Sequence, residues 1–156
     1  MSPIQTTNPF QIRLAEPEDI SFIIDSQIKM ARETENMELD PPTVAQGVAA
    51  VFGPAVMGEY YIAEKDGNRV ACLLTLLEWS DWRNGNVVWI HSAYVVPEHR
   101  GTGVFPKMYA FLKDKVQNSN LRGLRLYVDK TNLNAQKVYE KIGMTKDHYH
   151  LFEWMK

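Results

Sequence analysis

The chain has 156 residues, a length that suits one domain able to bury about two-thirds of its unfolded surface without a disulfide or a metal. Its 17 basic and 19 acidic residues leave a net charge of −2, which gives no electrostatic case for binding nucleic acid or an anionic membrane. The single cysteine, Cys72, excludes an internal disulfide and a cysteine metal cluster. No apolar run approaches the roughly 18 residues of a membrane span. Residues 1–8 are polar and lack a signal-peptide pattern, so we expect a flexible start and a cytoplasmic protein.

The N-terminal third is predicted to hold one strand and two helices. Residues 10–14 alternate apolar and polar side chains, as a half-buried strand does. An acidic segment around Pro17 opens a helix whose apolar stripe runs over residues 20–31. The proline pair at 41–42 starts a second helix, which ends at Gly53.

The rest of the chain is predicted to be mainly strands separated by two further helices. The expected strands are residues 60–63, 70–77, 87–96, 124–128 and 148–155, and the expected helices are residues 105–116 and 133–142. This order predicts an α/β (α+β) fold with a mixed sheet and helices on both of its faces. No repeat or long linker divides the chain, so we expect one domain over residues 1–156.

The turn after the strand at 87–96 is the most informative segment. It reads Val95-Val96-Pro97-Glu98-His99-Arg100-Gly101-Thr102-Gly103-Val104-Phe105 and leads into a helix. The first N–H groups of a helix lack partners and carry partial positive charge, and glycines let a phosphate approach them. The segment lacks the P-loop pattern and the third glycine of a dinucleotide fingerprint. A pyrophosphate-binding turn and an ordinary strand–helix turn both remain open at this point.

This segment resembles the signature of the GNAT superfamily of N-acetyltransferases, Val-x-Pro-x-x-Arg/Gln-x-x-Gly-x-Gly/Ala. Val95, Pro97, Arg100 and Gly103 match it in register, whereas Phe105 replaces the final small residue. The resemblance implies that the turn binds the pyrophosphate of acetyl-CoA.

A second segment, Asn132-x-x-Ala135-x-x-x-Tyr139-x-x-x-Gly143-Met144, resembles the family pattern Asn-x-x-Ala-x-x-x-Tyr-x-x-x-Gly-Phe. Asn132 and Tyr139 are about two helical turns apart and so share one helix face. In the family this tyrosine lies near the coenzyme sulfur and protonates the departing thiolate. The alternatives are a helix cap for Asn132 and a core aromatic for Tyr139.

The resemblance also implies the fold and the reaction. It implies a GNAT-like, mostly antiparallel twisted sheet of six to seven strands, with strands four and five splayed apart. It implies acetyl-CoA as co-substrate without a metal, and direct transfer to an amine in a ternary complex. The Trp-Arg-Asn-Gly turn at 82–85 weakly favours the spermidine/spermine acetyltransferase branch. The residues expected to contact the coenzyme are Ala93, Tyr94, Val95, Arg100, Gly101, Thr102, Gly103, Val104, Phe105, Asn132 and Ala135.

The catalytic base is expected on the strand at 87–96. Its alternation places Trp89, His91, Ala93 and Val95 on one face, beside the acetyl group. His91 is the best candidate, because the related arylalkylamine acetyltransferases use histidines on this strand. The alternative is a histidine bonded to a backbone carbonyl. Cys72 lies within an apolar run and is expected to be a buried structural cysteine rather than a nucleophile.

The acceptor is expected to be a small cationic amine. Residues 31–40 contain one arginine and four acidic residues, and the family uses this segment to wall the acceptor site. Glu33, Glu35, Asp81 and Trp89 are the expected acceptor-binding residues, since carboxylates and aromatic rings suit a cation. The alternatives are a solvated acidic loop, a protein acetyltransferase acting on lysine or an N-terminal amine, and a non-catalytic coenzyme A-binding module. A homodimer also remains open, because dimers are common in the family.

Overall fold

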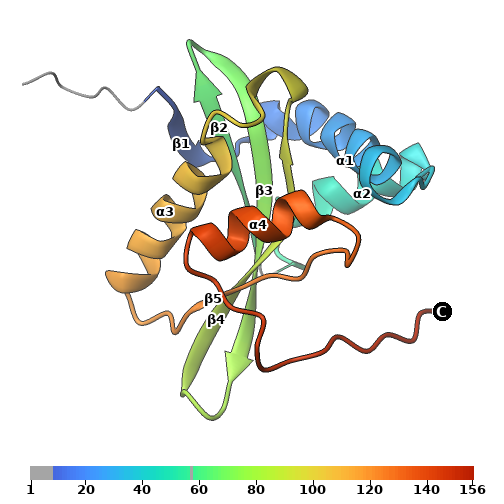
Figure 1. The fold of residues 1–156 in the computed structure, drawn as a ribbon. Helices are drawn as coiled ribbons and strands as arrows, with labels where there is room; N and C mark the ends of the chain where they lie inside the picture. Colours follow the sequence, from blue (N-terminus) through green and yellow to red (C-terminus); the bar gives the residue numbers. More distant parts are fainter. Residues whose placement is uncertain (1–8, 57) are drawn as a thin grey trace, which may run out of the picture. The chain divides into compact units, whose positions relative to one another are not determined.

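The structure is a computed structural model that describes residues 9–56 and 58–156 (Figure 1). It divides into two compact units, Met1–Arg125 and Leu126–Lys156. The expected flexibility of residues 1–8 lies outside the described residues, and the single domain over residues 1–156 stays a prediction. No helix of the described residues is long and apolar enough to cross a bilayer.

The first unit contains most of the predicted elements. In chain order these are β1 Gln11–Leu14, η1 Pro17–Asp19, α1 Ile20–Glu35, α2 Pro41–Val51, β2 Gly58–Lys65, β3 Asn68–Ser80, β4 Gly85–Val95, η2 Pro97–His99, α3 Val104–Gln117 and β5 Leu124–Arg125. Asp40 caps α2 by accepting a hydrogen bond from the Thr43 backbone N–H, as the sequence signal around the proline pair predicts.

The second unit contains α4 Leu133–Lys141, which confirms the last predicted helix. The strand predicted at 148–155 is wrong, because this segment is irregular in the structure. The composition of this segment suits a strand, but a strand forms only when a neighbouring strand pairs with it through backbone hydrogen bonds. The described residues provide no such ladder for this segment.

The sheet has the order β1-β2-β3-β4-β5. The first four strands pair antiparallel, and β5 pairs parallel to β4 at Val88–Leu124 and Trp89–Arg125. This confirms a mixed, mostly antiparallel sheet, with five strands among the described residues rather than six to seven. No further β4–β5 pair is present in the described part of the chain, although β4 continues to Val95.

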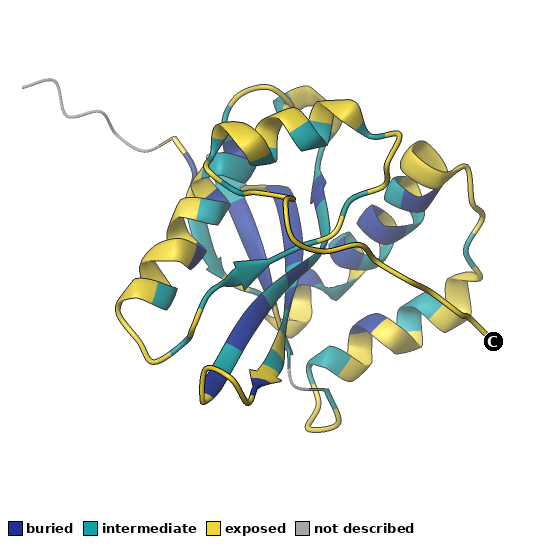
Figure 2. Ribbon diagram, turned by 60° about the horizontal axis from the view of Figure 1, so that its bottom comes forward, coloured by how far each residue is buried: buried dark blue, intermediate teal, exposed yellow. Residues whose placement is uncertain are grey.

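Helices cover both faces of this sheet within the first unit. On one face, Ile23 of α1 and Val48 of α2 pack with Tyr60, Cys72 and Tyr94, and we call this the α1–α2 face. Figure 2 shows the buried residues gathered on the central strands and on the inner sides of the helices.

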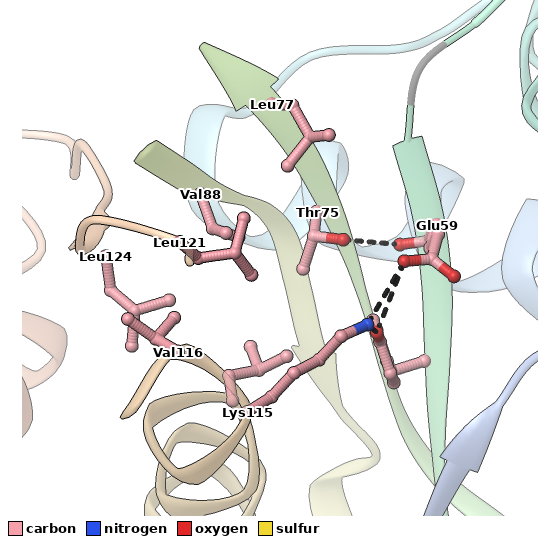
Figure 3. A pocket seen from close by; sticks show the side chains of 10 residues that line it. Glu59, Thr75, Leu77, Val88, Lys115, Val116, Leu121 and Leu124 are labelled. Atoms are coloured by element: carbon pink, nitrogen blue, oxygen red, sulfur yellow. Dashed lines mark hydrogen bonds and ion pairs between the residues drawn. The ribbon is translucent and has the colours of Figure 1, made fainter. Parts of the chain in front are cut away.

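On the other face, α3 packs over a cavity of about 30 Å³ (Figure 3). Lys115 Nζ donates a hydrogen bond to Tyr61 Oη at 2.6 Å and lies 3.3 Å from Glu59 Oε1. The cavity has room for water but not for a coenzyme. The packing of α3 against this face therefore stabilises the sheet rather than forming a coenzyme site.

A β-bulge interrupts β4. His91 pairs with Leu74 and Tyr94 pairs with Cys72, so two residues of β4, Ser92 and Ala93, lie opposite one residue of β3. Ser92 has a φ of 51°, in the left-handed region that non-glycine residues rarely adopt.

The bulge shifts the alternation of β4 by one residue. Trp89, His91 and Tyr94 pair with Leu76, Leu74 and Cys72, which alternate along β3, so these three share the α1–α2 face. Val95 pairs with Ala71 and faces the other side. The prediction that Val95 shares a face with Trp89 and His91 is therefore wrong, whereas the prediction for Ala93, which lies in the bulge, is not tested by this pairing.

Asp19, at the start of α1, is a buried charge with only 1% of its side chain exposed. Its oxygens accept hydrogen bonds from Arg13 at 2.7 and 2.9 Å, from the Glu16 backbone N–H at 2.7 Å, and from Arg69. The hydrogen bonds from Arg13 hold the pKa of the Asp19 carboxyl well below its usual range. The carboxylate therefore joins β1, the start of α1 and the start of β3.

We expect Asp19→Asn to lower the free energy of unfolding at pH 7 by about 2–4 kcal/mol, since it leaves two guanidinium groups without their carboxylate. Because the folded-state pKa is depressed, the wild-type contribution is complete above pH of about 4 and is lost as the pH falls. Urea unfolding at pH 7 and pH 3.5 should therefore show that the free energy of unfolding changes less with pH in the variant than in the wild type. Asp25→Asn, which breaks the exposed Asp25–Lys29 pair, should change stability little. Equal effects of the two substitutions would contradict this role.

Candidate active site

The glycine turn, residues 100–103, connects η2 to α3. Gly101 and Gly103 have φ values of 74° and 87°, which explains the requirement for glycine at both positions. The N–H groups of Gly101, Thr102 and Gly103 donate to no carbonyl of the described residues. A Cβ atom added to either glycine would meet nothing within 4 Å, so the turn is uncrowded at both positions. The turn can therefore present backbone donors and the positive end of α3 to a phosphate.

The Arg100 side chain contacts three other groups of the protein. Its Nε donates to the Val95 carbonyl at 2.9 Å, and its Nη2 donates to Glu33 Oε2 at 2.6 Å. The guanidinium carbon lies 5.4 Å from the centre of the Tyr94 ring. The structure thus joins Arg100, predicted for the coenzyme, to Glu33, predicted for the acceptor.

The other predicted coenzyme residues of the first unit surround the same turn. Thr102 donates its hydroxyl to the His99 carbonyl, and Val104 is buried at the start of α3. Ala93 lies in the bulge, and Phe105 is the second residue of α3. These placements are compatible with a binding turn whose donors come from the backbone.

In the second unit, the α4 motif forms a well-capped helix. Asn132 Oδ1 accepts a hydrogen bond from the Ala135 N–H at 3.1 Å, so Asn132 is the N-cap, as one of the alternatives predicts. At the other end Gly143, with a φ of 95°, donates to the Glu140 carbonyl, and Met144 donates to the Tyr139 carbonyl. This pair of bonds is a Schellman motif, which fixes the last turn of α4.

Tyr139 lies on α4, where burial raises the pKa of its hydroxyl above the usual value. The phenol is therefore protonated over the physiological pH range, as a proton donor must be. Cys72, by contrast, is buried, and burial raises the pKa of its thiol to about 12. The prediction of a structural cysteine is confirmed, because a thiol with this pKa is a poor nucleophile.

His91 and Trp89 form a ring pair on the α1–α2 face. Their ring centres are 6.0 Å apart, with 23° between the planes. The Trp89 indole N–H donates to Glu78 Oε2 at 3.0 Å, and Arg125 Nη1 donates to Glu78 Oε1 at 2.7 Å. Burial lowers the pKa of His91, so the imidazole is neutral at pH 7. Glu78 was not predicted as a site residue, because its neighbours depend on the register of β3 against β4.

The predicted acceptor carboxylates do not form one cluster. Glu35 is the exposed last residue of α1, near Glu33 in sequence. Asp81 lies in the turn between β3 and β4, where it accepts a hydrogen bond from the Trp82 N–H. The strand β4 extends about 35 Å from that turn to Val95, so Asp81 lies at the opposite end of the strand from the glycine turn. Within the described part of the chain, no group of three or more His, Cys, Asp or Glu side chains is arranged to hold a metal.

Residues 27–144 match the sequence profile of the acetyltransferase (GNAT) family. The chain belongs to this family. Acetyl transfer is thus the chemistry of this GNAT protein, with acetyl-CoA as its co-substrate. The comparison does not specify the spermidine/spermine branch, which stays a prediction. A comparison with curated proteins gave no significant match.

Solved structures agree with this assignment. A possible acetyltransferase from Clostridium difficile 630 is 36% identical with a TM-score of 0.87, over 94% of this chain and 97% of that one. A predicted acetyltransferase with acetyl-CoA from Clostridium acetobutylicum is 19% identical with a TM-score of 0.73, over 92% and 96% of the two chains. AAC(6')-Iy in complex with a bisubstrate analog is 17% identical with a TM-score of 0.72, over 94% and 98%. The last two show the GNAT fold alone.

We expect Gly103→Glu in this GNAT protein to weaken coenzyme A binding by about 100-fold or more, because the side chain adds negative charge in front of the N–H donors. Gly103→Ala separates strain from charge, since left-handed backbone costs alanine about 1–2 kcal/mol. Gly67→Ala is the matched control, because Gly67 has a φ of 77° in the turn between β2 and β3. Calorimetric titration with coenzyme A should show a loss for the Gly103 variants and none for Gly67→Ala. Unchanged affinity in a folded Gly103→Glu variant would contradict the site.

Proposed function

We propose that this protein is an N-acetyltransferase that moves the acetyl group of acetyl-CoA directly onto a small cationic primary amine. The observation that carries the proposal is the glycine turn at the start of α3. Its two left-handed glycines are uncrowded, and its N–H groups donate to no carbonyl of the described residues. Such an arrangement suits the pyrophosphate of coenzyme A. The chain offers no competing nucleophile in Cys72, which favours direct transfer over a covalent intermediate.

The amine must lose a proton before it attacks the thioester. An alkyl amine with a pKa near 10.4 costs about 4–5 kcal/mol to deprotonate at pH 7. The neutral imidazole of His91 is the proposed base, acting through a water molecule, and burial of the acceptor would lower the amine pKa further. The Trp89 ring fixes one side of the imidazole by stacking.

The departing thiolate must then gain a proton. The proposed donor is the Tyr139 hydroxyl, the role that the α4 motif has in the family. With a pKa of about 10 for tyrosine and about 8.5 for a thiol, the transfer is uphill by roughly 2 kcal/mol. Burial, which raises the Tyr139 pKa, adds to this difference but keeps the donor protonated.

A cationic acceptor is favoured by the residues on the α1–α2 face. Trp89 lies on this face, and an aromatic ring attracts an ammonium group. Glu78 beside it adds less attraction, because Arg125 already balances its charge. Glu35 adds an exposed carboxylate at the end of α1. Glu33 contributes less to this attraction than its sequence suggests, because Arg100 already balances its charge. In AAC(6')-Iy the bound bisubstrate analog joins coenzyme A to an acetylneamine, so in that protein the fold accommodates this compound.

A panel of acceptors with acetyl-CoA, read by thiol release, tests the proposal. It should contain diamines, arylalkylamines, aminoglycosides, anionic amino acids, and peptides with a free N-terminus or lysine. We expect a cationic small amine to give the highest kcat/KM. Preference for a peptide would support the protein acetyltransferase alternative, and coenzyme binding without any turnover would support the non-catalytic one.

Tyr139→Phe should lower kcat by about 100-fold, the usual scale for a positioned proton donor, while coenzyme A affinity stays the same. Initial rates across pH 6 to 10 with the best acceptor provide the measurement. Tyr149→Phe, which changes an exposed tyrosine of the same unit, is the control and should be silent. Wild-type turnover of Tyr139→Phe at every pH would give the donor role to water.

His91→Ala should lower kcat/KM most near neutral pH and least at high pH, where free amine is abundant. The low pKa of His91 implies that the wild-type acidic limb lies below pH of about 6.5. A full pH–rate profile of kcat/KM tests both statements. A loss of the same size at every pH would instead indicate that His91 only packs against Trp89.

A further inference from the structure

Arg100 is the one charged residue of the glycine turn, residues 100–103, and a positive side chain there would be expected to bind a phosphate. Its contacts are instead with Glu33, Tyr94 and Val95. We propose that Glu33 and Arg100 form a clamp that positions the glycine turn for acetyl-CoA, and that neither side chain binds the pyrophosphate. The inference rests on the proposed function, because it assigns two positioning residues to the same coenzyme site.

Three contacts hold the Arg100 side chain, and each comes from a different group. The Val95 carbonyl accepts from Nε, the Glu33 carboxylate accepts from Nη2, and the Tyr94 ring lies beneath the guanidinium. The guanidinium is planar and has a fixed set of donors, so these contacts define its orientation. A phosphate contact by Nη2 would have to compete with the 2.6 Å bond to Glu33.

The groups that hold Arg100 are themselves held firmly. Tyr94 is 5% exposed, belongs to the hydrophobic core, and lies directly after the bulge of β4. Its hydroxyl donates to Glu33 Oε1 at 3.5 Å, so ring and carboxylate support each other. Glu33 lies in the last turn of α1, which ends at Asn36 in a left-handed conformation. The clamp therefore connects a helix end, a core strand and the turn.

The charges of the clamp also favour a positioning role for Glu33 and Arg100, with the backbone N–H groups as the phosphate donors. Glu33 neutralises Arg100, so the pair adds little net charge beside the turn. The N–H groups of Gly101, Thr102 and Gly103 donate to no carbonyl of the described residues, so they are the donors that remain for a phosphate. A turn whose conformation is already fixed loses less conformational entropy when a pyrophosphate binds. The clamp therefore strengthens binding by lowering this entropic cost.

A double-mutant cycle separates a clamp from a phosphate ligand. Coenzyme A affinity is measured by calorimetry for the wild type, Glu33→Gln, Arg100→Gln and the double variant. If the clamp positions the turn, each single variant weakens binding by about threefold to tenfold, and the double variant is no weaker than either single one. In steady-state assays with the best acceptor of the panel, KM for acetyl-CoA should rise by the same factor with kcat unchanged.

If Arg100 instead binds the pyrophosphate, Glu33→Gln should no longer weaken coenzyme A binding. If Arg100 bound the pyrophosphate, Arg100→Gln would weaken binding strongly, whereas Glu33→Gln would leave it unchanged or strengthen it by freeing a positive charge. Additive effects, or wild-type affinity in all three variants, would also overturn the clamp. Arg100→Lys provides a second check, because it keeps the charge but loses the planar donor set, and the clamp predicts that it behaves like Arg100→Gln.

Glu38→Gln is the matched control for a nearby ion pair. Arg32 donates to Glu38 at 2.8 and 2.9 Å just past the end of α1, with both side chains exposed. This variant should bind coenzyme A within about twofold of the wild type. Thermal unfolding of every variant checks the fold. Absence of coenzyme A binding by the wild type would overturn the proposed function itself, and the clamp with it.

Discussion

The bulge in β4 is the constraint on which the functional half of this protein depends. One extra residue in a strand moves every later side chain to the other face of the sheet. Here that residue is inserted between His91 and Tyr94, and Tyr94 consequently enters the core beneath α1 and α2 instead of facing α3. From that position its ring and hydroxyl reach Arg100 and Glu33. The left-handed conformation of Ser92 is unfavourable on its own, so the packing of Tyr94 must compensate for it.

In the pyrophosphate site proposed after β4, the donors are backbone N–H groups rather than charged side chains. A mildly acidic protein can bind a pyrophosphate in this way, because the donors are peptide N–H groups whose direction is fixed by two glycines. The single arginine of the turn is balanced by Glu33, so the turn exerts little long-range attraction on an anion. Glu78 on the α1–α2 face is balanced in the same way by Arg125, so both carboxylates are largely neutralised by a neighbouring guanidinium.

The sequence predicts the helices and most strands because apolar periodicity, proline placement and turn residues are local signals. The proline pair that opens α2 and the glycine turn before α3 are both of this kind, and the structure confirms that a helix begins at each. The sequence could not predict the bulge, because Ser92 carries no turn signal. It also could not predict the Glu33–Arg100 contact, because these residues are 67 positions apart. Glu78 was missed for the same reason: its partner Trp89 is defined by strand register. The segment 148–155 shows the opposite error, where strand-like composition lacks the ladder that a strand requires.

The buried Asp19 has a consequence for the order in which the protein can be made. Its first partner, Arg13, is synthesised before it, but Arg69 follows 50 residues later. While the chain is still emerging from the ribosome, the beginning of α1 therefore carries a carboxylate whose burial is only partly compensated. The N-terminal helix can settle against the sheet only after β3 has begun to leave the exit tunnel. This segment therefore remains open to chaperones and proteases until well after Arg69 has been translated.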